Sequence, residues 1–384
     1  MSTTTGATAP TPAGVTDAAA RVHPHEVAAM RRALELAARG PAGPNPRVGC
    51  VLLAPGTATG GPTAGTVLGE GWHRGVGTPH AEVAALADAR ERGADVRGAT
   101  AVVTLEPCDH TGRTGPCSVA LVDAGVARVV VAVEDPNPVA AGGARRLRDA
   151  GVEVVTGALQ AEGSRFLAPW LSAVRRGRPF VTLKVASTLD GRVAAADGSS
   201  RWITSDVARR HAHTLRAEVG AIVVGTGTVL ADDPSLTART LDGSLVEHQP
   251  LRVVVGERDV PAGSRLRGPG GDLVHVRTHD PAHVLQVMQA REVRHVLVEG
   301  GPTLAAAFLA AGLVDEVHAY LAPVLLGAGP TAVGDLGITT IGDAIRLVPT
   351  EVLPLGPDVL VVASPAAPPG APTTNVRTST EEEH

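Results

Sequence analysis

The sequence predicts an α/β protein built from two domains. A chain of 384 residues is long enough to bury two separate cores. Hydrophobic residues make up 44% of the chain but aromatic residues only 2%, so the cores must be aliphatic. Short β-branched runs alternate with helical segments, and this alternation is typical of layered folds with largely parallel strands.

The expected elements follow from apolar periodicity and from the Gly and Pro residues that end each segment. In the first half we expect strands at 48–53, 67–72, 101–105, 128–133 and 152–155, and helices at 25–39, 118–124 and 144–150. In the second half we expect strands at 180–185, 221–224, 251–255, 273–277, 295–298, 316–321 and 359–362, and helices at 205–219, 281–291 and 304–311.

These elements divide the chain into a domain at 22–157 and a domain at 179–364. A helical connector over 158–178 joins them. Residues 1–21 and 365–384 are rich in polar residues and Pro, and we expect disordered tails there. A Gly- and Pro-rich insert at 55–65 reads as peripheral.

A metal-site motif organises the first domain. His80, Cys108 and Cys117 supply one imidazole and two thiolates, which leave the fourth position of a tetrahedral zinc ion free for water. Bound zinc lowers the pKa of its water to about 7, and Glu82 stands two residues past the histidine as general acid/base. This order of residues is typical of zinc deaminases that act on nucleobases.

The predicted local structure agrees with this motif. Thr78 can cap a helix that begins at Pro79 and has the histidine and glutamate in its first turn. Cys117 begins another helix, whose N-terminus favours a thiolate. Taken singly, each residue would more simply be interpreted as a hydrogen-bonded histidine or a small buried cysteine. Taken together, the residues favour a zinc deaminase site.

Composition limits the partners. The net charge is −5 and no block of Lys or Arg stands out, so a nucleic-acid substrate is disfavoured. The chain shows neither a transmembrane span nor a signal peptide, and its three cysteines do not make a disulfide framework. We expect Cys50 to be a buried structural thiol. We also expect a cytoplasmic protein.

Two glycine-bearing turns stand out in the second domain. The turn at 224–228 leaves a strand but lacks the third glycine and the following helix of a dinucleotide fingerprint, so it is weak evidence alone. The turn at 299–303 lies between a strand and a helix, where free amides suit a phosphate. An ordinary strand-to-helix turn remains the alternative there.

The whole set of motifs resembles the bifunctional deaminase/reductase family of riboflavin biosynthesis, over almost all of residues 25–363. The first half is similar in Pro-Asn-Pro at 44–46, Gly-Glu-Gly-Trp-His at 69–73, Pro-His-Ala-Glu at 79–82, Thr-Leu-Glu-Pro-Cys at 104–108 and Asp-Pro-Asn-Pro at 135–138. The second half is similar in Leu-Lys at 183–184, Leu-Asp-Gly at 189–191, Trp-Ile-Thr at 202–204, and the segments 228–234 and 299–303. The gap of eight residues between the two motif cysteines is also similar.

The resemblance implies a cytidine-deaminase-like three-layer α/β/α domain, followed by a dihydrofolate-reductase-like α/β domain. It implies zinc-dependent deamination of a phosphoribosylamino-pyrimidinone, then reduction of the ribosyl group by NADPH. The cofactor would be held by Ser187, Trp202, Thr228, Asp232, Gly301, Pro302, Thr303, Leu304, Ala305, Ala306 and Ala307. The substrate would be held by Ser200, Arg216, Leu236, Arg239 and Glu299, with the two arginines on its phosphate.

Two other hypotheses remain open. The second domain could be an inactive, reductase-like scaffold beside a working deaminase. Alternatively, the zinc could be structural in a nucleic-acid-binding protein, with His110 as fourth ligand. Self-association through the second domain is left open as a further expectation.

Overall fold

The structure, a computed structural model, describes residues 22–55, 63–111 and 115–366. Nearly all of the two expected tails and most of the insert at 55–65 lie outside these residues. The chain divides into two compact units. The first ends at Arg175 and the second begins at Arg176, except that Ala42–Pro44 group with the second. Each unit is described by itself.

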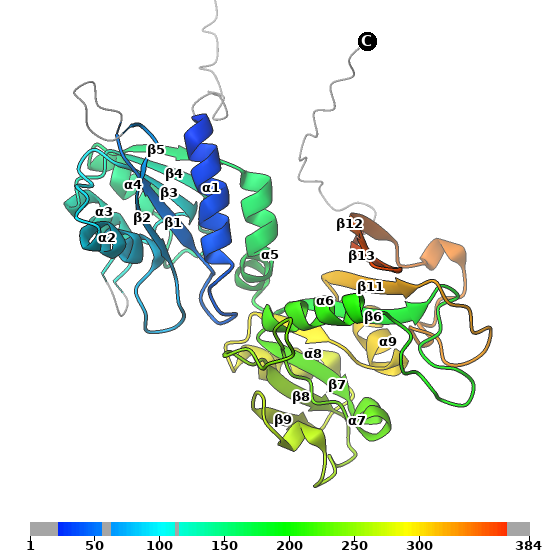
Figure 1. Cartoon of the computed structure of the whole chain (residues 1–384). Coiled ribbons are helices and arrows are strands. Elements are labelled where there is room, and N and C mark those ends of the chain that lie inside the picture. The colour runs from blue at the N-terminus through cyan, green and yellow to red at the C-terminus, as the bar shows by residue number, and fades with distance from the viewer. Residues whose placement is uncertain (1–21, 56–62, 112–114, 367–384) are drawn as a thin grey trace, which may run out of the picture. The chain divides into compact units, whose positions relative to one another are not determined.

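The first unit is built on a five-stranded sheet in the order β2-β1-β3-β4-β5 (Figure 1). Its strands are β1 (Gly49–Leu53), β2 (Val67–Trp72), β3 (Thr100–Leu105), β4 (Arg128–Val133) and β5 (Glu153–Thr156). The last three are parallel, whereas β1 is antiparallel to both of its neighbours. All five predicted strands are confirmed to within one residue.

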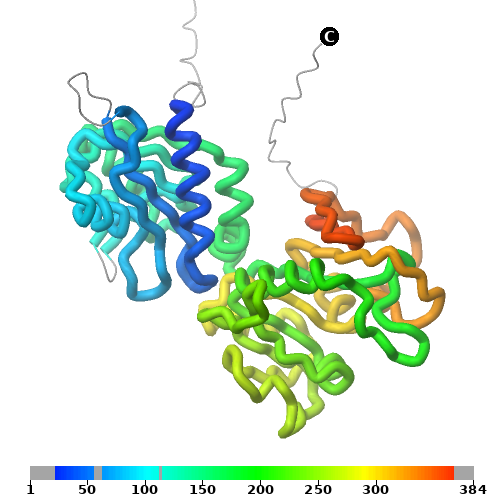
Figure 2. Tube along the Cα trace, viewed as in Figure 1, coloured from blue at the N-terminus to red at the C-terminus, as the bar shows by residue number. Residues whose placement is uncertain are grey.

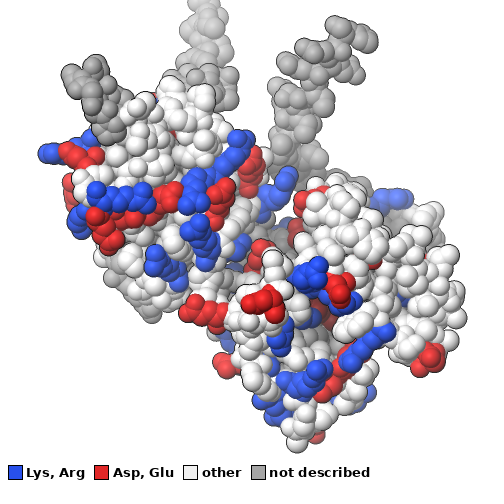
Figure 3. Space-filling model, viewed as in Figure 1, with Lys and Arg blue, Asp and Glu red and all other residues white. Residues whose placement is uncertain are grey.

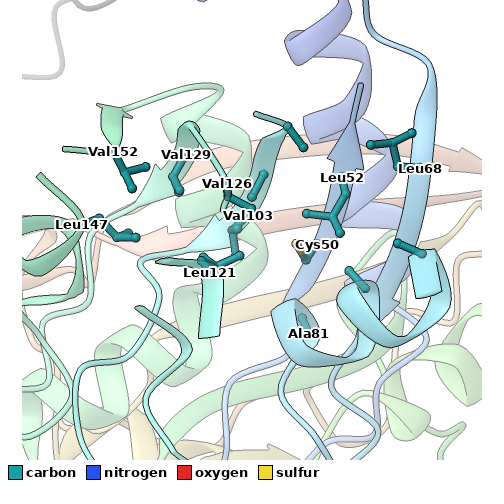
Figure 4. Packing of buried hydrophobic residues seen from close by; sticks show 14 of the residues in the cluster. Cys50, Leu52, Leu68, Ala81, Val103, Leu121, Val126, Val129, Leu147 and Val152 are labelled. Carbon is teal, nitrogen blue, oxygen red and sulfur yellow. The ribbon is translucent and has the colours of Figure 1, made fainter. Parts of the chain in front are cut away.

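Helices cover both faces of this sheet, which confirms the three-layer α/β/α arrangement. They are α1 (Pro24–Ala37), α2 (Ala81–Glu91), α3 (Cys117–Asp123), α4 (Gly143–Asp149) and α5 (Gln160–Arg176). On one face, α2, α3 and α4 pack on a core that includes Cys50, Val103 and Leu121 (Figure 4). On the other face, α1 and α5 run side by side (Figure 2). The helix expected as a connector therefore packs into this core.

Glycines let the helices approach the sheet closely. A Cβ atom at Gly71 of β2 would lie 2.3 Å from the Ala85 nitrogen of α2, and a Cβ at Gly49 would lie 1.9 Å from the Ala33 carbonyl oxygen of α1. Contacts this short are possible only without a side chain, so the two glycines set the distance between layers.

The predicted cap of α2 is wrong. The helix begins at Ala81, and His80 is its N-cap residue. Thr78 does not cap it, because the Thr78 hydroxyl donates to the Gly75 carbonyl oxygen over 2.7 Å and closes the turn before the helix. The start of α3 at Cys117 is as predicted.

The second unit has an eight-stranded sheet in the order β12-β13-β11-β6-β10-β7-β8-β9. Its strands are β6 (Phe180–Thr188), β7 (Ala221–Gly225), β8 (Leu251–Val255), β9 (Leu273–Val276), β10 (His295–Val298), β11 (Glu316–Ala322), β12 (Leu347–Leu355) and β13 (Asp358–Pro365). The six strands from β11 to β9 are parallel, and β13 and β12 are antiparallel additions at one edge.

Helices cover both faces of the second sheet as well. They are α6 (Asp206–Ala217), α7 (Thr226–Asp232), α8 (Pro281–Gln289) and α9 (Pro302–Ala310), with short 3₁₀ turns at Arg265–Arg267 and Ile341–Asp343. One core packs beneath α8 and α9, and two others beneath α6 and α7. Ser205 caps α6, accepting a hydrogen bond from the Ala208 amide.

The structure adds two elements to those predicted. The glycine turn after β7 does lead into a helix, the short α7, so the expectation that no helix follows is wrong. β12 was not predicted because its periodicity is weak: it is an exposed edge strand that carries Pro349 beside a register shift and Pro354. Prolines are tolerated at such an edge because no further strand needs their missing amide hydrogens.

Candidate active sites

Three predicted metal ligands meet in the first unit. The His80 Nδ1 atom lies 3.5 Å from Cys108 Sγ and 3.3 Å from Cys117 Sγ. All three ligand atoms lie within 4.8 Å of one another. A tetrahedral zinc ion with bonds of about 2.0–2.3 Å needs ligand atoms roughly 3.3–3.8 Å apart, so these residues fit one zinc ion.

Each ligand comes from the end of a different element. His80 is the N-cap of α2, Cys108 follows β3, and Cys117 is the first residue of α3. The Cys117 amide donates to Cys108 Sγ over 3.5 Å. Hydrogen bonding from Cys117, together with His80, lowers the pKa of Cys108 to about 4, as a thiolate ligand requires.

Glu82 lies beside this cluster in the first turn of α2. Its side chain is buried, at 3% exposure, and interacts with the Cys117 thiol. Burial raises the pKa of Glu82 to about 7. A carboxyl group with such a pKa can take up and release a proton near neutral pH.

His73 fixes the loop that presents His80, a contact that the sequence analysis did not foresee. The buried His73 ring donates from Nδ1 to the Pro79 carbonyl oxygen over 3.2 Å and accepts at Nε2 from Asn45 over 3.0 Å. It packs edge-on against the His80 ring, with centroids 5.5 Å apart. Its position in the Gly-Glu-Gly-Trp-His motif was the one available signal.

Glu106, two residues before Cys108, organises the backbone around the site. Its buried carboxylate accepts hydrogen bonds from three backbone amides, those of Asp135 at 3.2 Å, Gly142 at 3.3 Å and Ala144 at 2.9 Å. The carboxylate therefore ties the end of β3 to the loop after β4 and to the start of α4. Burial raises the pKa of Asp135, on this loop, to about 6.

His110 is not part of the ligand cluster. Among the described residues, the group of metal donors consists of one histidine and two cysteines. The His110 Nδ1 atom is buried and has no hydrogen-bond partner among the residues that the structure describes. The structure therefore lends no support to a closed zinc site with His110 as fourth ligand.

A second site is a cavity of about 740 Å³ in the second unit, on the side of α6 and α7. It brings together eight of the predicted cofactor and substrate residues: Ser200, Trp202, Arg216, Thr228, Asp232, Leu236, Arg239 and Glu299. Lys184, His213 and Arg209 also line it. The sequence analysis gave these three side chains no role, although Lys184 belongs to one of the motifs that carry the resemblance.

Buried charges form the floor of this cavity. Arg216 donates to both carboxylate oxygens of Glu299, each over 2.7 Å, and Lys184 Nζ lies 3.9 Å from the same carboxylate. Burial acts to raise the pKa of Glu299, but the Arg216 charge outweighs it and the pKa falls to about 2. Burial lowers the pKa of Lys184. Arg216 is therefore committed to an ion pair within the protein.

The remaining predicted cofactor residues lie outside the cavity lining. Gly301 contacts it indirectly, because the Gly301 amide donates to Thr228 Oγ1 over 3.1 Å. Pro302 begins α9, two residues before the helix expected at 304–311, and the segment to Ala307 lies in that helix. Ser187 is buried near the end of β6.

Trp202, which does line the cavity, is 70% exposed. The Arg209 Cζ atom lies over its ring, 4.3 Å from the centroid.

Comparison with protein families separates the same two parts. Residues 24–133 match the cytidine and deoxycytidylate deaminase zinc-binding region, and residues 179–361 match the RibD C-terminal domain. The chain is thus a two-part enzyme, a zinc-dependent deaminase followed by an NADPH-dependent reductase.

Relatives define the family. The riboflavin biosynthesis protein RibD of Mycobacterium tuberculosis is 48% identical over 84% of this chain and 92% of its own length. RibD of Acinetobacter baumannii superposes with a TM-score of 0.78 at 38% identity, covering 89% of this chain and 99% of the other. A Thermotoga maritima deaminase/reductase superposes with a TM-score of 0.80 at 33% identity and the same coverage. The chain belongs to the RibD family of bifunctional deaminase/reductases of riboflavin biosynthesis.

This membership confirms the predicted family, fold and paired activities. The cytidine-deaminase-like and reductase folds both occur, in the predicted order. The alternatives of an inactive scaffold and of a nucleic-acid-binding protein with structural zinc give way to an enzyme of small-molecule metabolism. Among the described residues, no helix combines the length and apolar character needed to cross a bilayer.

Proposed function

We propose that the first unit converts 2,5-diamino-6-(5-phosphoribosylamino)pyrimidin-4-one to 5-amino-6-(5-phosphoribosylamino)uracil, consuming water and releasing ammonia. The support comes from the Thermotoga maritima relative, which is described as a diaminohydroxyphosphoribosylaminopyrimidine deaminase and 5-amino-6-(5-phosphoribosylamino)uracil reductase. The convergence of His80, Cys108 and Cys117 within 4.8 Å carries the proposal.

These three residues would hold the zinc ion. When bound, zinc would activate water as a nucleophile at neutral pH. Glu82, buried beside Cys117, would accept a proton from that water and return protons to the ring nitrogen and to the departing amino group. Because Glu82 and His80 belong to the same turn of chain, the proton carrier keeps a fixed position relative to the metal.

The second unit would reduce the ribosyl group of the uracil product to a ribityl chain, giving 5-amino-6-(5-phosphoribitylamino)uracil. NADPH would supply the hydride. Trp202, Thr228 and Asp232 line the cavity where the cofactor would enter, and Gly301 with the start of α9 adjoins Thr228. Ser187 and residues 302–307 complete the proposed cofactor set.

Ser200, Leu236 and Glu299 would contact the substrate in the same cavity. The two arginines expected at its phosphate have different surroundings. Arg239 lines the cavity and donates to the Gly243 carbonyl oxygen over 2.6 Å, whereas Arg216 is held by Glu299. We therefore assign the main phosphate contact to Arg239, with Arg216 orienting the Glu299 carboxylate.

A coupled assay tests both reactions. The purified protein, supplied with the diaminopyrimidinone phosphate, should release ammonia and oxidise NADPH, and removal of zinc should stop both signals. Supplying the deaminated uracil directly to the zinc-free protein should restore NADPH oxidation. Ammonia release without NADPH oxidation under any of these conditions would contradict the assignment of the second unit.

The partners follow from the surface. On the face seen in Figure 3, basic and acidic side chains are interspersed, which supports the absence of a nucleic-acid partner.

Exposed apolar residues on and near β12, including Ile341, Val348 and Val352, support a homo-oligomer formed through the reductase unit. Sedimentation velocity of the wild type and of Val352→Asp would test this homo-oligomer.

A reducing, cytoplasmic location suits a site that needs two thiolates.

A further inference from the structure

Three strand ends lie side by side at one edge of the second sheet. β10, β7 and β8 are adjacent and parallel, so their carboxyl ends lie at the same end of the sheet. Two of them lead into proposed cofactor residues, Gly301 after β10 and Thr228 after β7, which are hydrogen-bonded to each other. The third strand, β8, leads into residues 256–259, to which the proposed function gives no role.

Arg258 of this segment reaches over the turn that follows β7. One terminal nitrogen of its guanidinium group lies 3.4 Å from the position that a Cβ atom would take at Gly227. Thr228, the next residue, is a proposed cofactor contact that lines the cavity. The Arg258 guanidinium group therefore lies close to the proposed cofactor path.

Gly256 makes this close approach possible. Its φ is +124°, and a Cβ atom at this position would lie 2.8 Å from the Thr226 hydroxyl oxygen. The Gly256 carbonyl oxygen also pairs with His275 Nε2 over 2.7 Å, so the backbone that leads to Arg258 is fixed from both sides.

The charge of Arg258 is available for a ligand. The side chain is exposed, and no carboxylate forms an ion pair with it within the described part of the chain. The nearest acidic residue in sequence after it, Asp259, pairs instead with Arg277. Arg277 also donates to the Glu257 carbonyl oxygen over 2.6 Å, which further fixes the segment.

We propose that Arg258 binds the 2′-phosphate of NADPH and so selects NADPH over NADH. The inference rests on the proposed cofactor site. The two dinucleotides differ only in that phosphate, and a guanidinium group binds phosphate oxygens in pairs. In dinucleotide-binding α/β sheets, the residue that reads the adenosine ribose follows a strand near the glycine turn, and an arginine there accommodates a 2′-phosphate. β8, next to β7, carries Arg258 to that place.

Direct binding measurements test the proposal without relying on turnover. The dissociation constants of NADPH and NADH are measured by titration calorimetry for the wild type and for Arg258→Gln. The variant should bind NADPH about 10- to 100-fold more weakly, the effect of losing a charged hydrogen-bonding pair, and NADH with little change. Arg258→Lys should fall between them, because a lysine keeps the charge but not the fork.

Arg291→Gln is the matched control. Arg291 is also an exposed arginine of this unit, but it precedes β10 and so lies toward the opposite edge of the sheet. Its replacement should leave both dissociation constants unchanged. Two fragments of the cofactor, adenosine 2′,5′-bisphosphate and adenosine 5′-phosphate, isolate the contact further. Arg258→Gln should weaken binding of the 2′,5′-bisphosphate and leave binding of the 5′-phosphate unchanged.

The outcomes separate the inference from the function beneath it. Equal weakening of NADPH and NADH in Arg258→Gln would show a general structural role and overturn the proposal, as would no change in either. Wild-type protein that bound neither dinucleotide would refute the reductase assignment, and this inference with it. A selective loss of NADPH and of the 2′-phosphorylated fragment would support it.

Discussion

Replacing Gly71 by alanine should damage the metal site from a distance. Gly71 lies in β2 beneath α2, and a Cβ atom there would lie 2.3 Å from the Ala85 nitrogen and 2.4 Å from the Ala81 carbonyl oxygen. Both are backbone atoms of the helix that begins after His80 and carries Glu82. No side-chain rotation can relieve such a contact, so the helix itself must move.

The size of the movement follows from these distances. Ordinary contact with a Cβ atom begins near 3.4 Å, so α2 must shift by about 1 Å. Metal sites accept errors of only about 0.2 Å in ligand distance, so this shift would separate His80 from the two cysteines. We expect zinc content to fall and deamination to drop by about 100-fold, the usual effect of a 1 Å misplacement. Overpacking should also lower the free energy of unfolding by about 1–3 kcal/mol.

The same chain supplies an internal control for this variant. Zinc per chain is measured by elemental analysis, and ammonia release and NADPH oxidation by separate assays, the second started from the deaminated uracil. The reductase rate should match the wild type because the second unit has its own core. Gly115→Ala adds the same methyl group where no described atom lies within 4 Å, and it should retain zinc. Full zinc content and a normal deamination rate in Gly71→Ala would refute the reasoning.

Four further outcomes are expected. Glu82→Gln should keep its zinc but lose about 10²–10⁴-fold in deamination rate, and a normal rate would exclude it as the proton carrier. Cys108→Ser should lower zinc content, and unchanged metal would mean that the ligand set is wrong. Glu106→Ala leaves three amides without an acceptor; it should raise the KM of deamination with zinc still bound, whereas an unaltered KM would make Glu106 irrelevant to the site. Because Arg216 lowers the pKa of Glu299 to about 2, their pairing stabilises the fold fully above pH 4.5 and is lost as the pH falls toward 2. Urea unfolding of Glu299→Gln should therefore show a lower free energy of unfolding than the wild type above pH 4.5 and a weaker pH dependence below it. A stability profile parallel to that of the wild type would contradict this expectation.

The sequence by itself determined the secondary structure of the first unit and its metal site. The runs that form β3, β4 and β5 are short and rich in valine and threonine, so local patterning was enough to find them. His80, Cys108 and Cys117 each stand at the end of a strand or the start of a helix. Because such ends gather at one edge of a sheet, order and residue type were sufficient to predict that they meet.

Only the tertiary structure decided how the charged residues pair and which loops meet. Arg216 is bound to Glu299, 83 residues away, which no local pattern indicates. His73 holds the turn before α2 through the Pro79 carbonyl oxygen and is itself held by Asn45. β12 forms although its exposed, proline-bearing sequence has little strand periodicity. Arg258 lies over Gly227 because β8 happens to be the neighbour of β7. Contacts between residues far apart in sequence depend on strand order and layer distance, and these are properties of the folded chain alone.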